Sequence, residues 1–78
     1  MTTALVVAAF DGPSTRFLCK DAKRGYWVST PDIERAQRFE GEANAREALA
    51  DWDPFIRQYG GGDWRVYEMT NRISFAPA

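Results

Sequence analysis

The acidic side chains between residues 40 and 53 are the group best placed, by type and spacing, to do chemistry. They are Glu40, Glu42, Glu47, Asp51 and Asp53. Arg46 is the one base among them, so the segment carries a local charge of −4. Paired carboxylates can hydrolyse glycosidic bonds, but that reaction needs a cleft that holds a sugar, and a chain of 78 residues rarely builds one. The segment therefore predicts an acidic face that binds a basic partner.

A basic group with aromatic neighbours offers the opposite chemistry. Its members are Arg16, Lys20, Lys23 and Arg24. With Tyr26 and Trp27 they could contact nucleic acid through phosphate charges and base stacking. The formal net charge of −1 favours an ordinary solvated hairpin, because nucleic-acid-binding proteins usually carry a larger basic field. A small nucleic-acid-binding or regulatory module is thus the alternative function.

Histidine is absent and cysteine is scarce, although many enzymes rely on these two residue types. The chain has no histidine, and Cys19 is its one cysteine, which removes the commonest general base, a Cys–His nucleophile and the ligand set of a zinc site. The glycines at 60–62 are followed by Asp63 and Trp64 in place of the Lys and Ser/Thr of a phosphate-binding loop. We therefore expect no enzymatic activity, no metal, no cofactor and no small-molecule substrate.

Composition predicts a single folded domain over residues 1–78. Hydrophobic residues make up 45% and aromatic residues 14% of the chain, which is enough for one core. A lone cysteine forms no internal disulfide, which indicates a reducing, cytoplasmic environment. The apolar run at residues 3–10 is too short to cross a bilayer and has no basic region before it. We expect no membrane contact or signal peptide, and either a monomer or a weak homodimer.

The elements that must position these side chains can be read from periodicity and turn residues. Strands are predicted at residues 3–10, 16–20, 26–29, 64–70 and 71–75. A turn at residues 11–14 and a tail at residues 76–78 flank them, and Thr30 is expected to cap a short helical segment. The predicted fold is α+β: a small antiparallel sheet of four to five strands with one main helix, plus one or two short helical turns, packed on one face.

The main helix is predicted over residues 42–52. Ala45, Ala48, Leu49 and Trp52 recur at spacings of three and four and form its apolar face. Asp53 and Pro54 are expected to end it and to begin a further short turn, with Asp53 as the cap.

Two acids on this helix oppose its stability. Glu47 and Asp51 are four residues apart, so they repel by about 0.2–0.5 kcal/mol, and Asp51 lies near the negative end of the helix dipole. A partner-binding role explains this placement. A solvated acidic surface that only promotes solubility is the alternative.

Residues 17–52 resemble very small proteins of phages and mobile elements, including anti-CRISPR proteins. The resemblance rests on Phe17-Leu18-Cys19, residues 25–28, residues 33–39, and Ala45 with Ala48-Leu49. It departs at Gly41, where Ser or Thr would cap the helix. It implies a non-enzymatic inhibitor in the cytoplasm of a bacterial host cell. Such an inhibitor would bind subunits of a type I CRISPR surveillance complex (Cascade, of type I-C for instance) and block target DNA through its acidic face.

Overall fold

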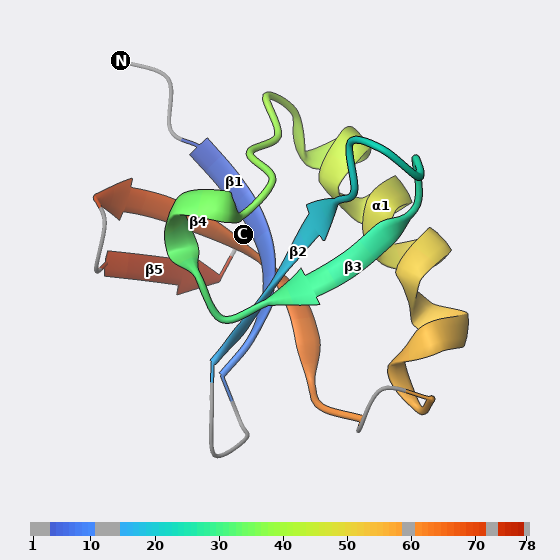
Figure 1. The fold of residues 1–78 in the computed structure, drawn as a ribbon. Coiled ribbons are helices and arrows are strands. Elements are labelled where there is room, and N and C mark those ends of the chain that lie inside the picture. The colour runs from blue at the N-terminus through green and yellow to red at the C-terminus, as the bar shows by residue number, and fades with distance from the viewer. Residues whose placement is uncertain (1–3, 11–14, 59–60, 72–73, 78) are drawn as a thin grey trace.

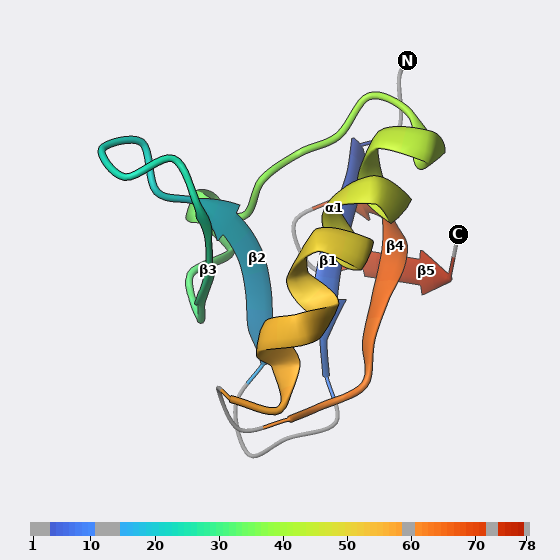
Figure 2. The same ribbon diagram turned by 90° about the vertical axis from the view of Figure 1, so that its right-hand side faces the viewer.

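The computed structural model describes residues 4–10, 15–58, 61–71 and 74–77 of the chain. In chain order the elements are β1 (Ala4–Ala9), β2 (Arg16–Lys20), β3 (Trp27–Thr30), the 3-10 turn η1 (Ile33–Arg35), α1 (Glu42–Ile56), β4 (Trp64–Asn71) and β5 (Ser74–Pro77). The strands form one antiparallel sheet in the order β3-β2-β1-β4-β5. The helix α1 lies across one face of this sheet (Figures 1 and 2). The predicted α+β fold is confirmed.

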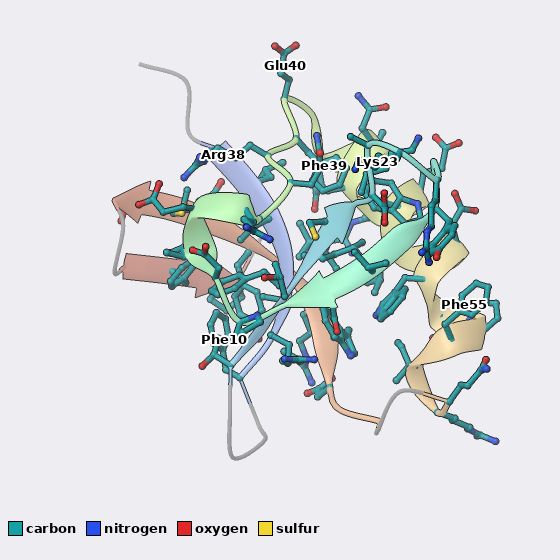
Figure 3. All side chains as sticks on the ribbon, in the orientation of Figure 1. Phe10, Lys23, Arg38, Phe39, Glu40 and Phe55 are labelled. Carbon is teal, nitrogen blue, oxygen red and sulfur yellow. The ribbon has the colours of Figure 1, made fainter. Side chains whose placement is uncertain are left out.

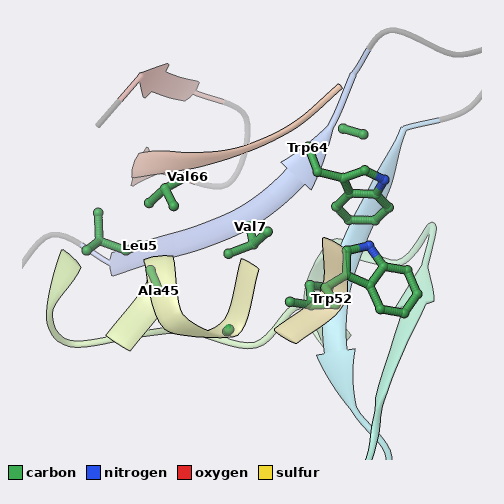
Figure 4. Packing of buried hydrophobic residues seen from close by; sticks show 9 residues of the cluster. Leu5, Val7, Ala45, Trp52, Trp64 and Val66 are labelled. Atoms are coloured by element: carbon green, nitrogen blue, oxygen red, sulfur yellow. The ribbon is translucent and has the colours of Figure 1, made fainter. Parts of the chain in front are cut away.

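The main core lies between α1 and the sheet. The helix contributes Ala45, Ala48 and Trp52, and Trp52 is 2% exposed. They pack against Leu5, Val7, Ala9, Leu18, Trp64 and Val66 (Figure 4). The rings of Trp52 and Trp64 meet edge to face with centroids 5.5 Å apart, an arrangement that aromatic pairs favour. The predicted apolar face of the helix is thus the face that covers the sheet.

The opposite face of the sheet carries a second cluster. It consists of Val6, Ala8, Phe17, Ala36 and Met69, with Ile33, Tyr67 and Phe75 packed against it. Because β1 lies at the centre of the sheet with both faces covered, it is an unbroken apolar run. The turn η1 covers part of this second face. Its cap is Asp32, whose carboxylate accepts from the Glu34 N–H at 2.9 Å, so the prediction of Thr30 as the cap is wrong by two residues.

The segment between η1 and α1 runs between β1 and β2. These strands pair directly only at Ala8–Phe17 and Ala9–Arg16. Further along, Gln37 N–H donates to the Leu18 carbonyl at 2.9 Å. Phe39 exchanges two backbone hydrogen bonds with Leu5, at 2.9 and 3.2 Å. The chain thereby passes from the η1 side of the sheet to the α1 side. Phe39 packs 5.9 Å from the Trp27 ring, ring centre to ring centre.

The helix α1 continues through Pro54 to Ile56, so the prediction that it ends at Asp53 and Pro54 is wrong. Pro54 has no N–H to donate within the helix. The last turn is nonetheless held by packing: the Phe55 ring stacks on Trp52 at 6.1 Å, and Ile56 is half-buried against the core. Asp53 is therefore a residue inside the helix and not a cap. The Gly61 N–H then donates to the Ile56 carbonyl at 2.7 Å, with Gly61 at a φ of +77°.

The last strand differs from its prediction. β5 pairs with β4 through Phe75–Met69, Ala76–Glu68 and Pro77–Tyr67, so Ala76 and Pro77 belong to the sheet and not to a tail. The predicted turn at 11–14 lies outside the described residues, as do Gly60 and Ala78.

Candidate binding groove between the hairpin and the helix

A groove separates the β2–β3 hairpin from the C-terminal half of α1. Its volume is about 620 Å³. It is lined by Lys20, Gly25, Tyr26, Trp27, Asp51 and Phe55. The hairpin and the helix meet here because Trp27 packs into the core beneath α1. The groove therefore brings one residue of the predicted acidic face beside one residue of the predicted basic group.

Three aromatic side chains line this groove. Trp27 is half-buried and also packs against the core. Tyr26 on the hairpin is 47% exposed and Phe55 on the helix is 45% exposed, and Figure 3 shows Phe55 projecting outward from α1. Large aromatics that stay exposed beside a cavity are typical anchors for a partner.

Opposite charges stand on the two sides of the groove. Lys20 extends over the Trp27 ring, with Nζ 5.5 Å from the ring centre, a cation–π contact. Arg24 donates from Nη1 to the Tyr26 hydroxyl at 2.7 Å, and this hydrogen bond raises the pKa of Arg24. On the helix side, Asp51 forms no ion pair with any described residue. Lys20 likewise forms no ion pair with a described residue, so the lining of the groove carries one positive and one negative charge.

The five predicted acidic residues do not share one face of α1. Glu42 accepts two hydrogen bonds from Arg46, the shorter at 2.6 Å, and is compensated. Residues two apart in an α-helix are separated by about 200°, so Asp51 and Asp53 lie on opposite flanks. Asp51 faces the hairpin, whereas Asp53 lines a separate depression of about 380 Å³ with Arg46.

The remaining two acids take different positions. Glu47 is exposed on α1, one turn before Asp51, so these two neighbour each other as predicted. Glu40 precedes the helix and points away from it (Figure 3). Of the predicted acidic face, the structure brings together Glu47 and Asp51.

The predicted basic group is divided in a similar way. The tip of the hairpin carries Lys20, Lys23 and Arg24. There Asp21 Oδ1 accepts from the backbone N–H groups of Lys23 and Arg24 at 2.9 and 3.1 Å. Arg16 lies at the other end of β2, about 13 Å along the strand. It lines a smaller cavity of about 260 Å³.

Phe55 is the site residue that sequence reasoning missed, because the helix was expected to stop before it. Continuing the helical pattern past Pro54 would have found it. Ile56 extends the apolar stripe of Ala48 and Trp52, while Phe55 falls beside that stripe and toward solvent.

Other chemistry finds little support in the described part of the chain. Residues 4–10, 15–58, 61–71 and 74–77 contain no group of three or more acids or cysteines that could hold a metal ion. Burial raises the pKa of the Cys19 thiol, although Arg35 acts in the opposite direction. A raised pKa disfavours the reactive thiolate. No helix within those ranges has the length and apolarity to cross a membrane.

Comparisons with protein-family models, with curated protein sequences and with solved structures find no match to this chain.

Proposed function

We propose that this protein is a non-enzymatic binding protein that inhibits its target by occupying a basic surface on it. The observation that carries the proposal is the groove, where Tyr26 and Phe55 are exposed beside the carboxylate of Asp51. Aromatic residues at the centre of an interface supply most of its binding energy. Unpaired acids beside them choose a basic partner and speed its association.

The placement of the acids supports a role in binding over one in stability alone. Asp51 and Asp53 lie near the C-terminal end of α1, and the last turn contains no basic residue. Negative charge at this end is unfavourable by about 0.3–1 kcal/mol at low salt. A basic partner surface would compensate that cost on binding. Asp53 can no longer be explained as a helix cap, so it joins Glu47 and Asp51 as an acid for which the fold offers no structural reason.

The proposed target is a protein surface that normally receives nucleic acid, since such surfaces are basic. The resemblance of residues 17–52 to anti-CRISPR proteins selects a type I CRISPR surveillance complex in the bacterial cytoplasm as the first target to test. In this proposal the acidic flank of the groove takes the place of target DNA.

The test measures binding of the purified protein to a type I-C surveillance complex, together with the affinity of that complex for target DNA. The double variant Glu47→Lys/Asp51→Lys should weaken binding about tenfold or more and should restore DNA binding. The matched control is Glu40→Lys/Glu68→Lys, which changes the net charge equally at exposed sites away from the groove. Equal loss in both variants would show a general charge effect. Unchanged inhibition by the first variant would refute the acidic mechanism.

One observation favours the alternative of nucleic-acid binding: Lys20, Lys23 and Arg24 lie together beside the exposed ring of Tyr26. Asp51 across the groove opposes phosphate binding there. A gel-shift assay with single- and double-stranded DNA and RNA at low salt separates the two functions. A shift that Lys23→Glu/Arg24→Glu abolishes supports this alternative, and no shift at micromolar protein rejects it.

A further inference from the structure

The outer edge of β3 presents backbone groups that have no partner within the described residues. Asp21 N–H donates to the Tyr26 carbonyl at 2.9 Å, so these residues form a hydrogen-bonded pair between the two arms of the hairpin. Hydrogen-bonded and non-hydrogen-bonded pairs alternate along antiparallel strands. The N–H and C=O groups of Trp27 and Ser29 therefore point away from β2. The position of Leu18 is consistent with this orientation. Leu18 lies opposite Ser29, and its carbonyl accepts from Gln37 N–H on the side of β2 that faces away from β3.

The two edges of the sheet are protected to different degrees. Pro77 in β5 lacks an N–H and weakens pairing at that edge. β3 contains neither a proline nor a charged side chain among its four residues. Figure 2 shows β3 at the outer side of the sheet, with β2 between it and β1. An uncharged edge strand with free peptide groups is a template for another strand.

We propose that β3 pairs in antiparallel orientation with β3 of a second copy of this chain. This inference is independent of the proposed function. The register follows from the outward groups. With Val28 facing Val28 of the second copy, Trp27 faces Ser29 of the second copy, and all four outward groups of each strand are used. A shift in one direction places Ser29 opposite the turn residue Gly25, and a shift in the other places Trp27 opposite Pro31, which has no N–H.

Charge complementarity favours a second copy as the occupant. Residues 20–24, which precede β3, carry a net charge of +2, and residues 31–35, which follow it, carry −1. Antiparallel pairing places the basic end of each copy beside the acidic end of the other. In the stated register the hairpin turn that carries Arg24 lies near Asp32 of the second copy. Asp32 already has Arg35 as an exposed neighbour, at 3.7 Å, so the added attraction is modest and should weaken with salt.

The short length of β3 also limits how strong the dimer should be. A stable interface buries about 800 Å² on each partner, and a four-residue edge provides less. We therefore expect association only at protein concentrations of about 100 μM and above. The two-fold axis is perpendicular to the sheet, so both α1 helices and both grooves lie on the same side of the dimer. A partner with two basic sites would then be bound bivalently.

Sedimentation velocity from about 10 μM to about 1 mM protein tests the proposal. A concentration-dependent dimer that weakens with salt is expected. Ser29→Pro removes one outward N–H without removing a bond to β2, and should raise the dissociation constant about tenfold or more. Ser29→Ala is the matched control, because it keeps the N–H and should still dimerise. A monomer throughout the concentration range overturns the proposal, as does a dimer that a folded Ser29→Pro variant leaves unchanged.

Amide hydrogen exchange on the unmodified protein gives a second readout if Ser29→Pro fails to fold. The Trp27 and Ser29 amides should become slower to exchange as the concentration rises, whereas the outward amides of β5 should not change. Equal protection at low and high concentration contradicts β3 pairing, whatever the oligomeric state.

Discussion

The two halves of α1 differ in how their residues affect the stability of the helix. The first half, residues 42–48, begins with Glu42 at the positive end of the helix dipole, pairs it with Arg46 at 2.6 Å, and buries two alanines. The second half, residues 49–56, contains Pro54, an exposed Phe55 and acids without an ion pair among the described residues. The first arrangement favours a stable helix, and the second opposes one.

This contrast shows that the features least favourable to helix stability lie in the second half of α1. Trp52 holds the second half to the sheet, and its burial compensates for unfavourable features around it. Two of those features, Asp51 and Phe55, line the groove, where a partner would contact them, whereas Asp53 lies on the opposite flank of the helix. If the second half of α1 is a binding element, its residues should divide into one that holds the helix and several that act on the partner.

Replacing Trp52 should have the largest effect on folding. Trp52→Ala removes the largest fully buried side chain and should lower the free energy of unfolding by about 3–5 kcal/mol, as measured by chemical denaturation. Since small domains have a total stability of about 5–15 kcal/mol, this variant could be largely unfolded. Trp52→Phe should then show a smaller loss of about 1–2 kcal/mol. A loss below about 1 kcal/mol in Trp52→Ala would contradict the docking of α1 through this residue.

Replacing Phe55 should weaken target binding more than it lowers the stability of the fold. Phe55→Ala should lower the free energy of unfolding by only about 1 kcal/mol, because the side chain is 45% exposed. It should weaken target binding about thirtyfold, the loss of about 2 kcal/mol that is typical of an aromatic anchor. Calorimetry against the surveillance complex measures the second quantity. Leu49→Ala, on the flank of α1 that carries Asp53, is the control: it should reduce stability with little effect on affinity.

Most of the fold could be predicted from the sequence because local patterns and tertiary packing agree there. The bounds of β2 at Arg16 and Lys20 were predicted to the residue, and the spacing of Ala45, Ala48 and Trp52 gave the buried face of the helix. The end of α1 was missed because packing of Phe55 and Ile56 overrides the local signal of Pro54.

The candidate site was harder to predict than the fold. Charge along the chain put Asp51 and Asp53 into one acidic group, but helical geometry separates them to opposite flanks. The groove is lined by residues from 20–27 and from 51–55, which are far apart in the sequence. Short-range sequence patterns cannot predict that these two segments lie side by side. The position of the groove depends on the segment near Phe39, which crosses the sheet between β1 and β2.

Restoring the helical hydrogen bond at Pro54 tests whether packing alone holds the last turn. Pro54→Ala returns an N–H to the helix and should raise the free energy of unfolding by about 1 kcal/mol, less than the full cost of an interior proline because the site lies in the last turn. Target binding should stay within about twofold, since Phe55 is already held by Trp52. A large gain in affinity would instead show that the last turn orders only on binding.

Neutralising one acid in each half of α1 should change stability in opposite directions. Glu42→Gln removes a favourable charge at the helix start and its contact with Arg46, and should lower the free energy of unfolding by about 0.5 kcal/mol. Asp51→Asn removes an acid near the negative end of the dipole and its repulsion with Glu47, and should raise that free energy by about 0.3 kcal/mol. Thermal unfolding at low salt resolves the two signs, and high salt should reduce both effects. If Asp51→Asn also lowers the free energy of unfolding, Asp51 has a structural partner. That result would contradict the interpretation that Asp51 lowers the stability of the helix and serves binding instead.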